Sequence, residues 1–148
     1  MKRDRNSLEK IIGSLFFLGK IKGGGTYSSF ITAFLLFLFL DWSSLYYFII
    51  GFVLILLSFL LSLRISEDPT WFTLDEVSGT IVTFAFHGKS LSVLILGLVL
   101  FRFFDIFKIP PLKKIEHLKG GIVLDDIFAG ILASIFLFVL DFIKSLYG

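Results

Sequence analysis

The chain has 148 residues, of which 56% are hydrophobic and 18% charged, and its mean hydropathy is +0.92. A soluble domain of this size has only about half of its residues apolar, whereas here charge is confined to short intervals between long apolar runs. The net charge of +2 is too small to indicate nucleic-acid binding, and the absence of cysteine excludes disulfides and thiolate metal sites. The composition therefore predicts an all-α integral membrane protein.

Residues 1–20 predict an amphipathic helix that lies on the membrane surface. Its apolar residues recur at helical spacing, at Leu8, Ile11, Ile12, Leu15 and Phe16. A secretory signal is not indicated, because no small-residue cleavage site follows the apolar residues.

The chain is expected to form one membrane-embedded domain, residues 1–148, with a helical bundle over residues 27–142. Turn residues separate five apolar segments, at about Tyr27–Leu40, Leu45–Leu63, Phe72–Phe86, Leu91–Phe107 and Ile122–Phe142. Leu45–Leu63 contains no charged residue, and at about 1.5 Å per residue it nearly covers a hydrocarbon core of about 30 Å. The pattern predicts a polytopic bundle of about four to five membrane helices.

The basic residues predict which end of the bundle faces the cytoplasm. If the five segments alternate in direction, only Lys89 and Lys144 of the 14 basic residues fall at the end away from the N-terminus. An excess of Lys and Arg marks cytoplasmic loops. We therefore expect the N-terminus in the cytoplasm, and Asp75, Glu76, Asp105, Asp125 and Asp126 all at the cytoplasmic ends of their helices.

Asp75 and Glu76 allow two interpretations. Thr73 and Glu76 fit a capping box, in which both acids would only stabilise a helix start. A helix that begins at Pro69 would instead carry both acids into its second turn, where capping does not explain them. Gly79, four residues after Asp75, would let another helix approach closely.

Asp125 and Asp126 carry a similar ambiguity. One acid would suffice to complement a helix dipole, and two adjacent carboxylates repel each other without a cation. Ala129 and Gly130 then repeat the pattern of small residues after the acids.

Arg102, Asp105 and Lys108 are spaced at i, i+3 and i+6, near one face of a helix end. In one interpretation they form a surface ion-pair ladder, worth less than about 1 kcal/mol. In the other they supply one more metal ligand and two cations for an anionic group.

Five carboxylates without thiolates or a histidine pair indicate a hard cation. Mg²⁺ prefers oxygen ligands and commonly bridges to phosphate. Glycine-rich segments beside lysines, Lys22–Thr26 and Lys119–Gly121, offer backbone N–H groups to phosphate oxygens. These residues predict Mg²⁺-dependent chemistry on a phosphate at the membrane surface.

The motifs resemble those of the phosphatidylglycerophosphatase A family, in family order over about residues 19–133. The matching pieces are Gly25–Ser29, Glu67–Pro69 with Leu74–Gly79, Phe101–Lys108, Lys119–Gly121 and Leu124–Gly130. The chain departs from the family pattern at Gly24, where a proline is usual, and in the short spacer Ile122–Val123.

The resemblance implies a Mg²⁺-dependent phosphatase of the bacterial cytoplasmic (inner) membrane that converts phosphatidylglycerophosphate to phosphatidylglycerol and phosphate. The implied metal ligands and catalytic residues are Asp75, Glu76, Asp105, Asp125 and Asp126. The implied phosphate-binding residues are Arg102, Lys108, Lys119 and Thr26.

Other classes fit less well. An ion or proton transporter would place carboxylates near the middle of the bilayer, and a non-catalytic scaffold would need no Mg²⁺. A phosphatidyltransferase of CDP-activated lipids would carry an Asp-Gly-x-x-Ala-Arg segment, which is absent, and histidine-dependent lipid phosphatases need two motif histidines. Another Mg²⁺-dependent lipid phosphate phosphatase remains an alternative.

Overall fold

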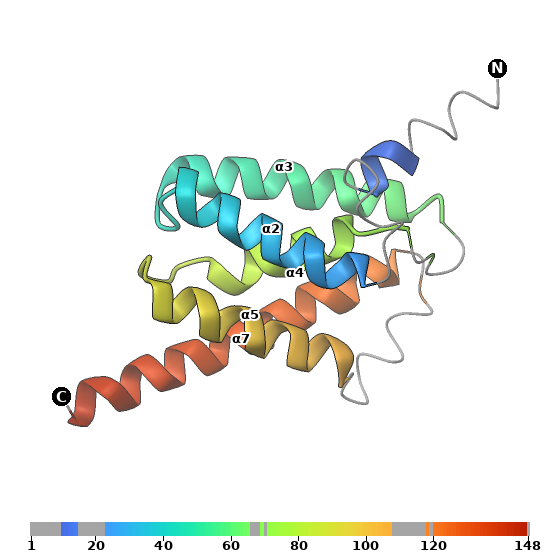
Figure 1. Ribbon diagram of the computed structural model, residues 1–148. Coiled ribbons are helices and arrows are strands. Elements are labelled where there is room, and N and C mark those ends of the chain that lie inside the picture. Colours follow the sequence, from blue (N-terminus) through green and yellow to red (C-terminus); the bar gives the residue numbers. More distant parts are fainter. Residues whose placement is uncertain are drawn as a thin grey trace, which may run out of the picture.

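The computed structural model describes residues 10–14, 23–65, 69, 71–107, 118 and 120–147 (Figure 1). This part of the chain is all-helical and contains no strand. Its main helices are α2 Gly24–Phe39, α3 Leu45–Ser62, α4 Leu74–Phe84, α5 Leu91–Ile106 and α7 Gly121–Tyr147. The five predicted segments are therefore confirmed as helices, with ends that differ by a few residues.

The predicted N-terminal amphipathic helix lies mostly outside the described residues. Residues 10–13 form a short helical piece, and the Gly13 carbonyl accepts a hydrogen bond of 2.8 Å from Thr73 N. A Cβ at Gly13 would meet the rings of Trp71 and Phe72. This piece of the N-terminal region therefore packs against the start of α4.

Local sequence sets where the helices begin and end. Ser44 caps α3 by accepting from Tyr47 N at 3.2 Å, and Ser90 caps α5 by accepting from Val93 N at 3.2 Å. At the end of α4 the backbone leaves the helix at Ala85, and Phe86 adopts a positive φ of 70°.

The hypothesis that α4 begins at Pro69 is wrong. The helix begins at Leu74, with Thr73 at the N-cap. The Phe72 N–H donates to the Pro69 carbonyl at 2.9 Å, which closes a turn before the helix starts. Asp75 and Glu76 consequently lie in the first turn of α4, as the capping interpretation expected.

The central element is α4, which packs against all four of the other main helices (Figure 1). Most of its residues are buried, including three with hydroxyl groups. Each hydroxyl donates to a carbonyl four residues earlier: Ser78 to Leu74, Thr80 to Glu76 and Thr83 to Gly79. These polar side chains of α4 are thus satisfied within their own helix, as an apolar environment requires.

The helices alternate in direction, so the starts of α2, α4 and α7 lie at the same end of the bundle as the end of α5. The opposite end is closed by aromatic side chains. Trp42 and Phe84 are fully buried, with ring centroids 4.6 Å apart, and Phe37 packs against the edge of Trp42. Residues 138–147 of α7 are exposed, and the C-terminal end of this helix projects beyond the rest of the bundle (Figure 1).

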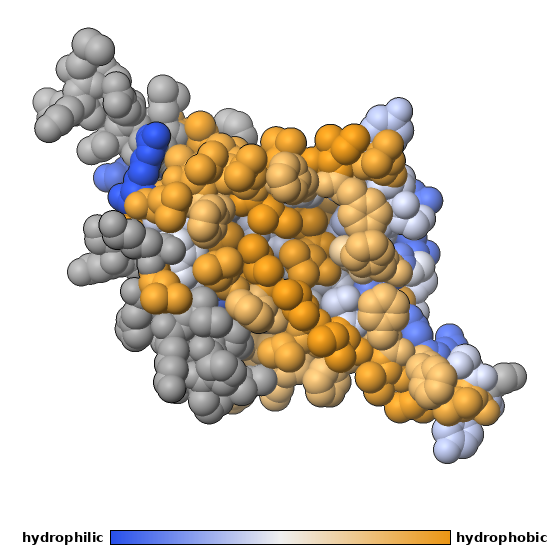
Figure 2. Space-filling model, turned by 180° about the vertical axis from the view of Figure 1, so that it is seen from behind, coloured by the Kyte–Doolittle hydropathy of each residue, from blue (hydrophilic) through white to orange (hydrophobic). Residues whose placement is uncertain are grey.

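Much of the surface is apolar. Figure 2 shows one broad hydrophobic face across the middle of the molecule, with hydrophilic residues towards its edges. Among the described helices, α3 and α7 are long and apolar enough to cross a membrane by length and composition, while α2 is apolar but shorter. The finding is consistent with a membrane protein.

A close contact joins α4 and α7 through glycines. A Cβ at Gly130 would collide with the Gly79 carbonyl and meet Val82 Cβ at 3.2 Å. A Cβ at Gly79 would collide with Phe101 and meet the Asp126 carbonyl at 2.6 Å. The small residues noted after each acidic pair therefore serve the close approach expected of them.

Replacing Gly130 with Ala should destabilise the bundle. Ala favours a helix by about 1 kcal/mol over Gly, but a Cβ that collides with the Gly79 backbone should cost more than this gain, up to about 3 kcal/mol. Thermal unfolding in detergent measures the difference. Gly88→Ala is the matched control, because no atom lies within 4 Å of the position that its Cβ would take. Equal melting temperatures for the two variants would contradict the tight crossing.

Candidate metal centre

The first turn of α4 presents two carboxylates to the inside of the bundle. Asp75 is buried, and the Glu76 side chain is only 15% exposed. Thr73 makes no side-chain cap hydrogen bond; instead, Asp75 Oδ1 accepts from Glu76 N at 3.0 Å. The capping box is therefore not formed, although both acids occupy its position in the helix.

Asp126 brings a third carboxylate from α7. It is 5% exposed, and its carboxylate lies against those of Asp75 and Glu76. One oxygen from each of the three residues lies within 4.8 Å of the others. Residues about 50 positions apart in the sequence therefore form one cluster, which we call the acidic cluster.

Two further predicted ligands lie around this cluster. Asp105, at the end of α5, lies close to the Asp126 carboxylate. Asp125 is buried as well, but it is not one of the three residues of the acidic cluster. Asp125 lies about 100° around α7 from Asp126, and it is the Asp126 carboxylate that lies with those of Asp75 and Glu76.

Arg102 joins α5 to the acidic cluster. Its Nη1 lies 2.6 Å from Asp105 Oδ2 and 3.9 Å from Glu76 Oε1. The side chains of Arg102 and Asp105 are only 19% and 15% exposed, so this pair is not the solvated surface ladder of the first interpretation. The Arg102 guanidinium therefore places one positive charge at the edge of the negatively charged acidic cluster.

The start of α2 lies against Glu76. A Cβ at Gly25 would occupy the position of the Glu76 carboxylate, so only glycine leaves room for it there. Thr26 follows in the first turn of α2 and is partly buried. The first N–H groups of a helix have no intrahelical partner and carry partial positive charge, which makes this end of α2 a favourable neighbour for an anion.

Two predicted phosphate-binding residues, Lys108 and Lys119, lie outside the described residues. The contact between Gly25 and Glu76 was not predicted. The sequence feature that indicates this contact is the glycine run before Thr26. That run predicts backbone N–H groups for a phosphate, but it does not by itself predict a close approach to Glu76.

His87 forms a separate polar group at the opposite end of the bundle. Its Nε2 lies 2.9 Å from Ser134 Oγ, its Nδ1 lies 3.9 Å from Asp141 Oδ2, and its ring stacks on Phe138. Burial lowers the pKa of His87, and the nearby Asp141 carboxylate opposes this in part. His87 therefore ties the turn after α4 to α7, far from the acidic cluster.

The described residues form a helical bundle with an apolar surface and a buried carboxylate cluster beside an arginine, which is consistent with a membrane protein that has a candidate cation site. The family model of phosphatidylglycerophosphatase A matches residues 11–141. The chain therefore belongs to the phosphatidylglycerophosphatase A family, a family of phosphatases.

A curated relative from Bacteroides thetaiotaomicron, named "Putative phosphatidylinositol-3-phosphatase", is 32% identical over 78 residues. The match covers 49% of this chain and 49% of the relative, so the chain spans about half the length of the curated relative it matches. No solved structure matches significantly.

The lowered pKa of His87 predicts a pH-dependent stability. At pH values below 6.5, the ordinary pKa of histidine, His87 is protonated in the unfolded chain but still neutral in the folded chain. The free energy of unfolding should therefore fall as the pH drops from 6.5 towards the pKa of the folded state. His87→Gln does not titrate and can still bond to Ser134. Melting temperatures in detergent between about pH 7.5 and 5.5 should therefore fall less for the variant. Parallel curves for both proteins would contradict the assignment.

Proposed function

We propose that this protein is a Mg²⁺-dependent lipid phosphatase that hydrolyses the phosphomonoester of phosphatidylglycerophosphate, which yields phosphatidylglycerol and phosphate. The observation that carries the proposal is the acidic cluster, formed by Asp75, Glu76 and Asp126 at one end of the bundle. Membership of the phosphatidylglycerophosphatase A family supplies the substrate class.

The cluster suits a hard divalent cation. Its donors are carboxylate oxygens, the ligands that Mg²⁺ prefers. Three carboxylates within 4.8 Å repel one another strongly in a buried position. Asp75, Glu76 and Asp126 would hold the ion, with Asp105 and Asp125 beside them. A bound ion of this kind polarises a phosphoryl oxygen and lowers the pKa of a bound water.

The other residues of the site orient the phosphate. Arg102 is close enough to the cluster to neutralise charge on the phosphoryl oxygens, which phosphoryl transfer requires. The ion pair with Asp105 fixes the position of the guanidinium. Thr26 and the first N–H groups of α2 would offer hydrogen-bond donors, and Lys108 and Lys119 are proposed to add positive charge.

The proposed location is the bacterial cytoplasmic membrane, with the acidic cluster at the cytoplasmic face. The distribution of basic residues supports this orientation, and the apolar α3 and α7 support a spanning bundle. In this arrangement α2, α4 and α5 complete a single multi-pass domain, and the amphipathic N-terminal segment lies on the membrane surface. Only the lipid head group then needs to leave the bilayer.

A second candidate is the hydrolysis of another lipid phosphate. The name of the Bacteroides thetaiotaomicron relative points to an inositol lipid, and the same cluster would serve any phosphomonoester. A transporter is less well supported, because the described carboxylates of the site lie together at one end of the bundle and not along its length.

A phosphate-release assay on the purified protein in detergent tests the function. It compares phosphatidylglycerophosphate, phosphatidylinositol 3-phosphate, phosphatidic acid and a soluble phosphate ester, each with Mg²⁺ and with a chelator. We expect the highest kcat/KM for phosphatidylglycerophosphate and no turnover after chelation. A preference for the inositol lipid would favour the second candidate, and turnover unaffected by chelation would contradict the metal centre.

Asp75→Asn and Asp126→Asn should each lower turnover by roughly 100-fold or more, as expected for loss of an electrostatic group at a reacting centre. Both should also weaken Mn²⁺ binding, measured by electron paramagnetic resonance. Asp41→Asn is the control, because Asp41 is exposed in the turn between α2 and α3, where its carboxylate accepts hydrogen bonds from Ser43. Wild-type rates and Mn²⁺ affinity in both cluster variants would remove the proposed site.

A further inference from the structure

An apolar groove of about 160 Å³ lies between α2 and α5. Its walls are entirely hydrophobic side chains, contributed by Phe30, Phe34, Leu94, Ile95, Leu98 and Val99. Phe30, Ile95 and Val99 are more than half exposed, so the groove opens sideways onto the outer surface of the bundle.

The groove leads to the proposed phosphate-binding residues. On α5, Arg102 comes three and four residues after Val99 and Leu98, which places it one turn further along the same face. On α2, Thr26 comes four residues before Phe30 and is therefore one turn nearer to the start of that helix. The start of α2 and the end of α5 meet at Glu76, where Gly25 and Arg102 both approach its carboxylate.

We infer that the groove between α2 and α5 binds one acyl chain of the lipid phosphate substrate while the phosphate group lies at Arg102. The inference rests on the proposed function and adds the position of the lipid. Hydrocarbon matches the wholly apolar walls, and the guanidinium at the end of the groove matches the charge of the phosphate. In this position the phosphate group would lie between Arg102 and the acidic cluster, with Glu76 as the nearest carboxylate of the cluster.

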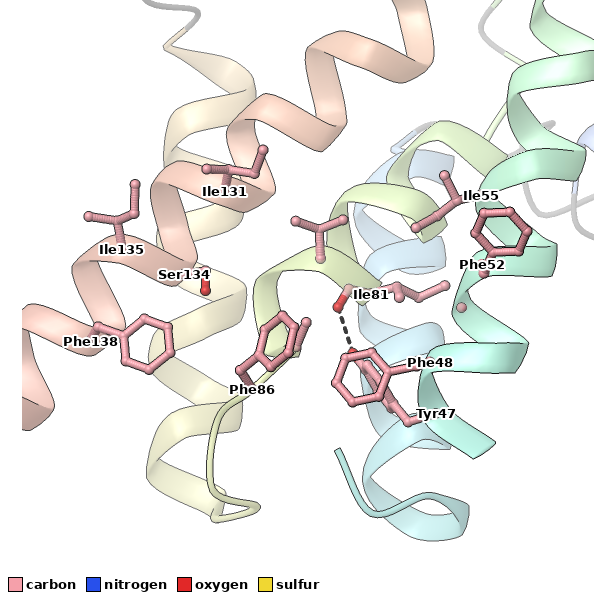
Figure 3. Close-up of a pocket in the computed structure, with 13 residues that line it drawn as sticks. Tyr47, Phe48, Phe52, Ile55, Ile81, Phe86, Ile131, Ser134, Ile135 and Phe138 are labelled. Atoms are coloured by element: carbon pink, nitrogen blue, oxygen red, sulfur yellow. Dashed lines mark hydrogen bonds between the residues drawn. The ribbon is translucent and has the colours of Figure 1, made fainter. Parts of the chain in front are cut away.

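A larger hollow of about 550 Å³ is less suitable for the reacting lipid (Figure 3). It lies between α3, α4 and α7, with Phe48 and Ile55 on one side, Ile131 and Phe138 on the other, and Phe48 close to Phe86 (Figure 3). No charged residue lines it among the described residues. Ile131 comes five residues after Asp126, so the two side chains point about 140° apart around α7.

The two hollows allow a matched test. Ile95→Trp fills the groove between α2 and α5, whereas Ile135→Trp fills the larger hollow; the two isoleucines are 55% and 51% exposed. With long-chain phosphatidylglycerophosphate, Ile95→Trp should lower kcat/KM by about tenfold, because several methylene contacts are lost. With a dihexanoyl substrate it should match the wild type, and Ile135→Trp should match it with both substrates. Equal effects of the two variants on the long-chain substrate would overturn the inference.

Photocrosslinking tests the position of the lipid without turnover. The Asp126→Asn variant is mixed with phosphatidylglycerophosphate that carries a diazirine in one acyl chain, and the labelled peptides are identified by mass spectrometry. Label at residues 30–34 and 94–99 supports the groove, whereas label confined to residues 48–55 and 131–138 overturns it.

The two proposals fail in different ways. If the wild type releases no phosphate from any lipid, the proposed function fails. The crosslinked peptides then still show whether the groove between α2 and α5 takes the lipid chain.

Discussion

The close crossing of α4 and α7 is the contact on which the site depends. Gly79 and Gly130 let the two backbones touch, and the Asp126 carbonyl lies where a Gly79 side chain would be. This approach sets Asp126 against the first turn of α4, where Asp75 and Glu76 project. Without it, three carboxylates on two helices would not reach a common point. The acidic cluster is therefore a product of helix packing as much as of the acids themselves.

The polar residues of α4 illustrate how the bundle accommodates its central helix. Ser78, Thr80 and Thr83 satisfy their hydroxyls within the helix, so they need no partner from the neighbouring helices. The acids of the first turn are arranged differently, because they face other carboxylates and the Arg102 guanidinium. The same helix thus combines a highly charged start with a remainder whose polar groups are satisfied. Such concentrated charge in a buried place is typical of function.

Most of the fold could be predicted from the sequence, because long apolar runs and turn residues mark the helices directly. Their alternation also predicted that the acids would share one end of the bundle, which the positions of Asp75, Glu76, Asp105 and Asp126 confirm. The start of α4 was ambiguous, since Pro69 and Thr73 are both good helix-start signals. Only the packed structure decides between them, through the turn from Pro69 to Phe72.

The site was predictable in residue type but not in arrangement. The sequence alone cannot tell which of two adjacent acids belongs to the acidic cluster. That Asp126 does and Asp125 does not follows only from the rotation of α7. The approach of Gly25 to Glu76 joins two segments about 50 residues apart and leaves no periodic signal in either one. The metal, the orientation in the membrane and the roles of Lys108 and Lys119 stay predictions.

The brevity of α4 bears on how a lipid reaches the site. Its 11 residues rise only about 16 Å at about 1.5 Å each, roughly half the hydrocarbon thickness of a bilayer. The helices α2 and α5, which meet the start of α4 at Glu76, have 16 residues each and rise about 24 Å, so they are also shorter than that thickness. In the proposed membrane location, the bilayer beside these short helices would thin locally to match them. The head groups of the surrounding leaflet would then sink towards the carboxylates, and the membrane itself would help to deliver the substrate.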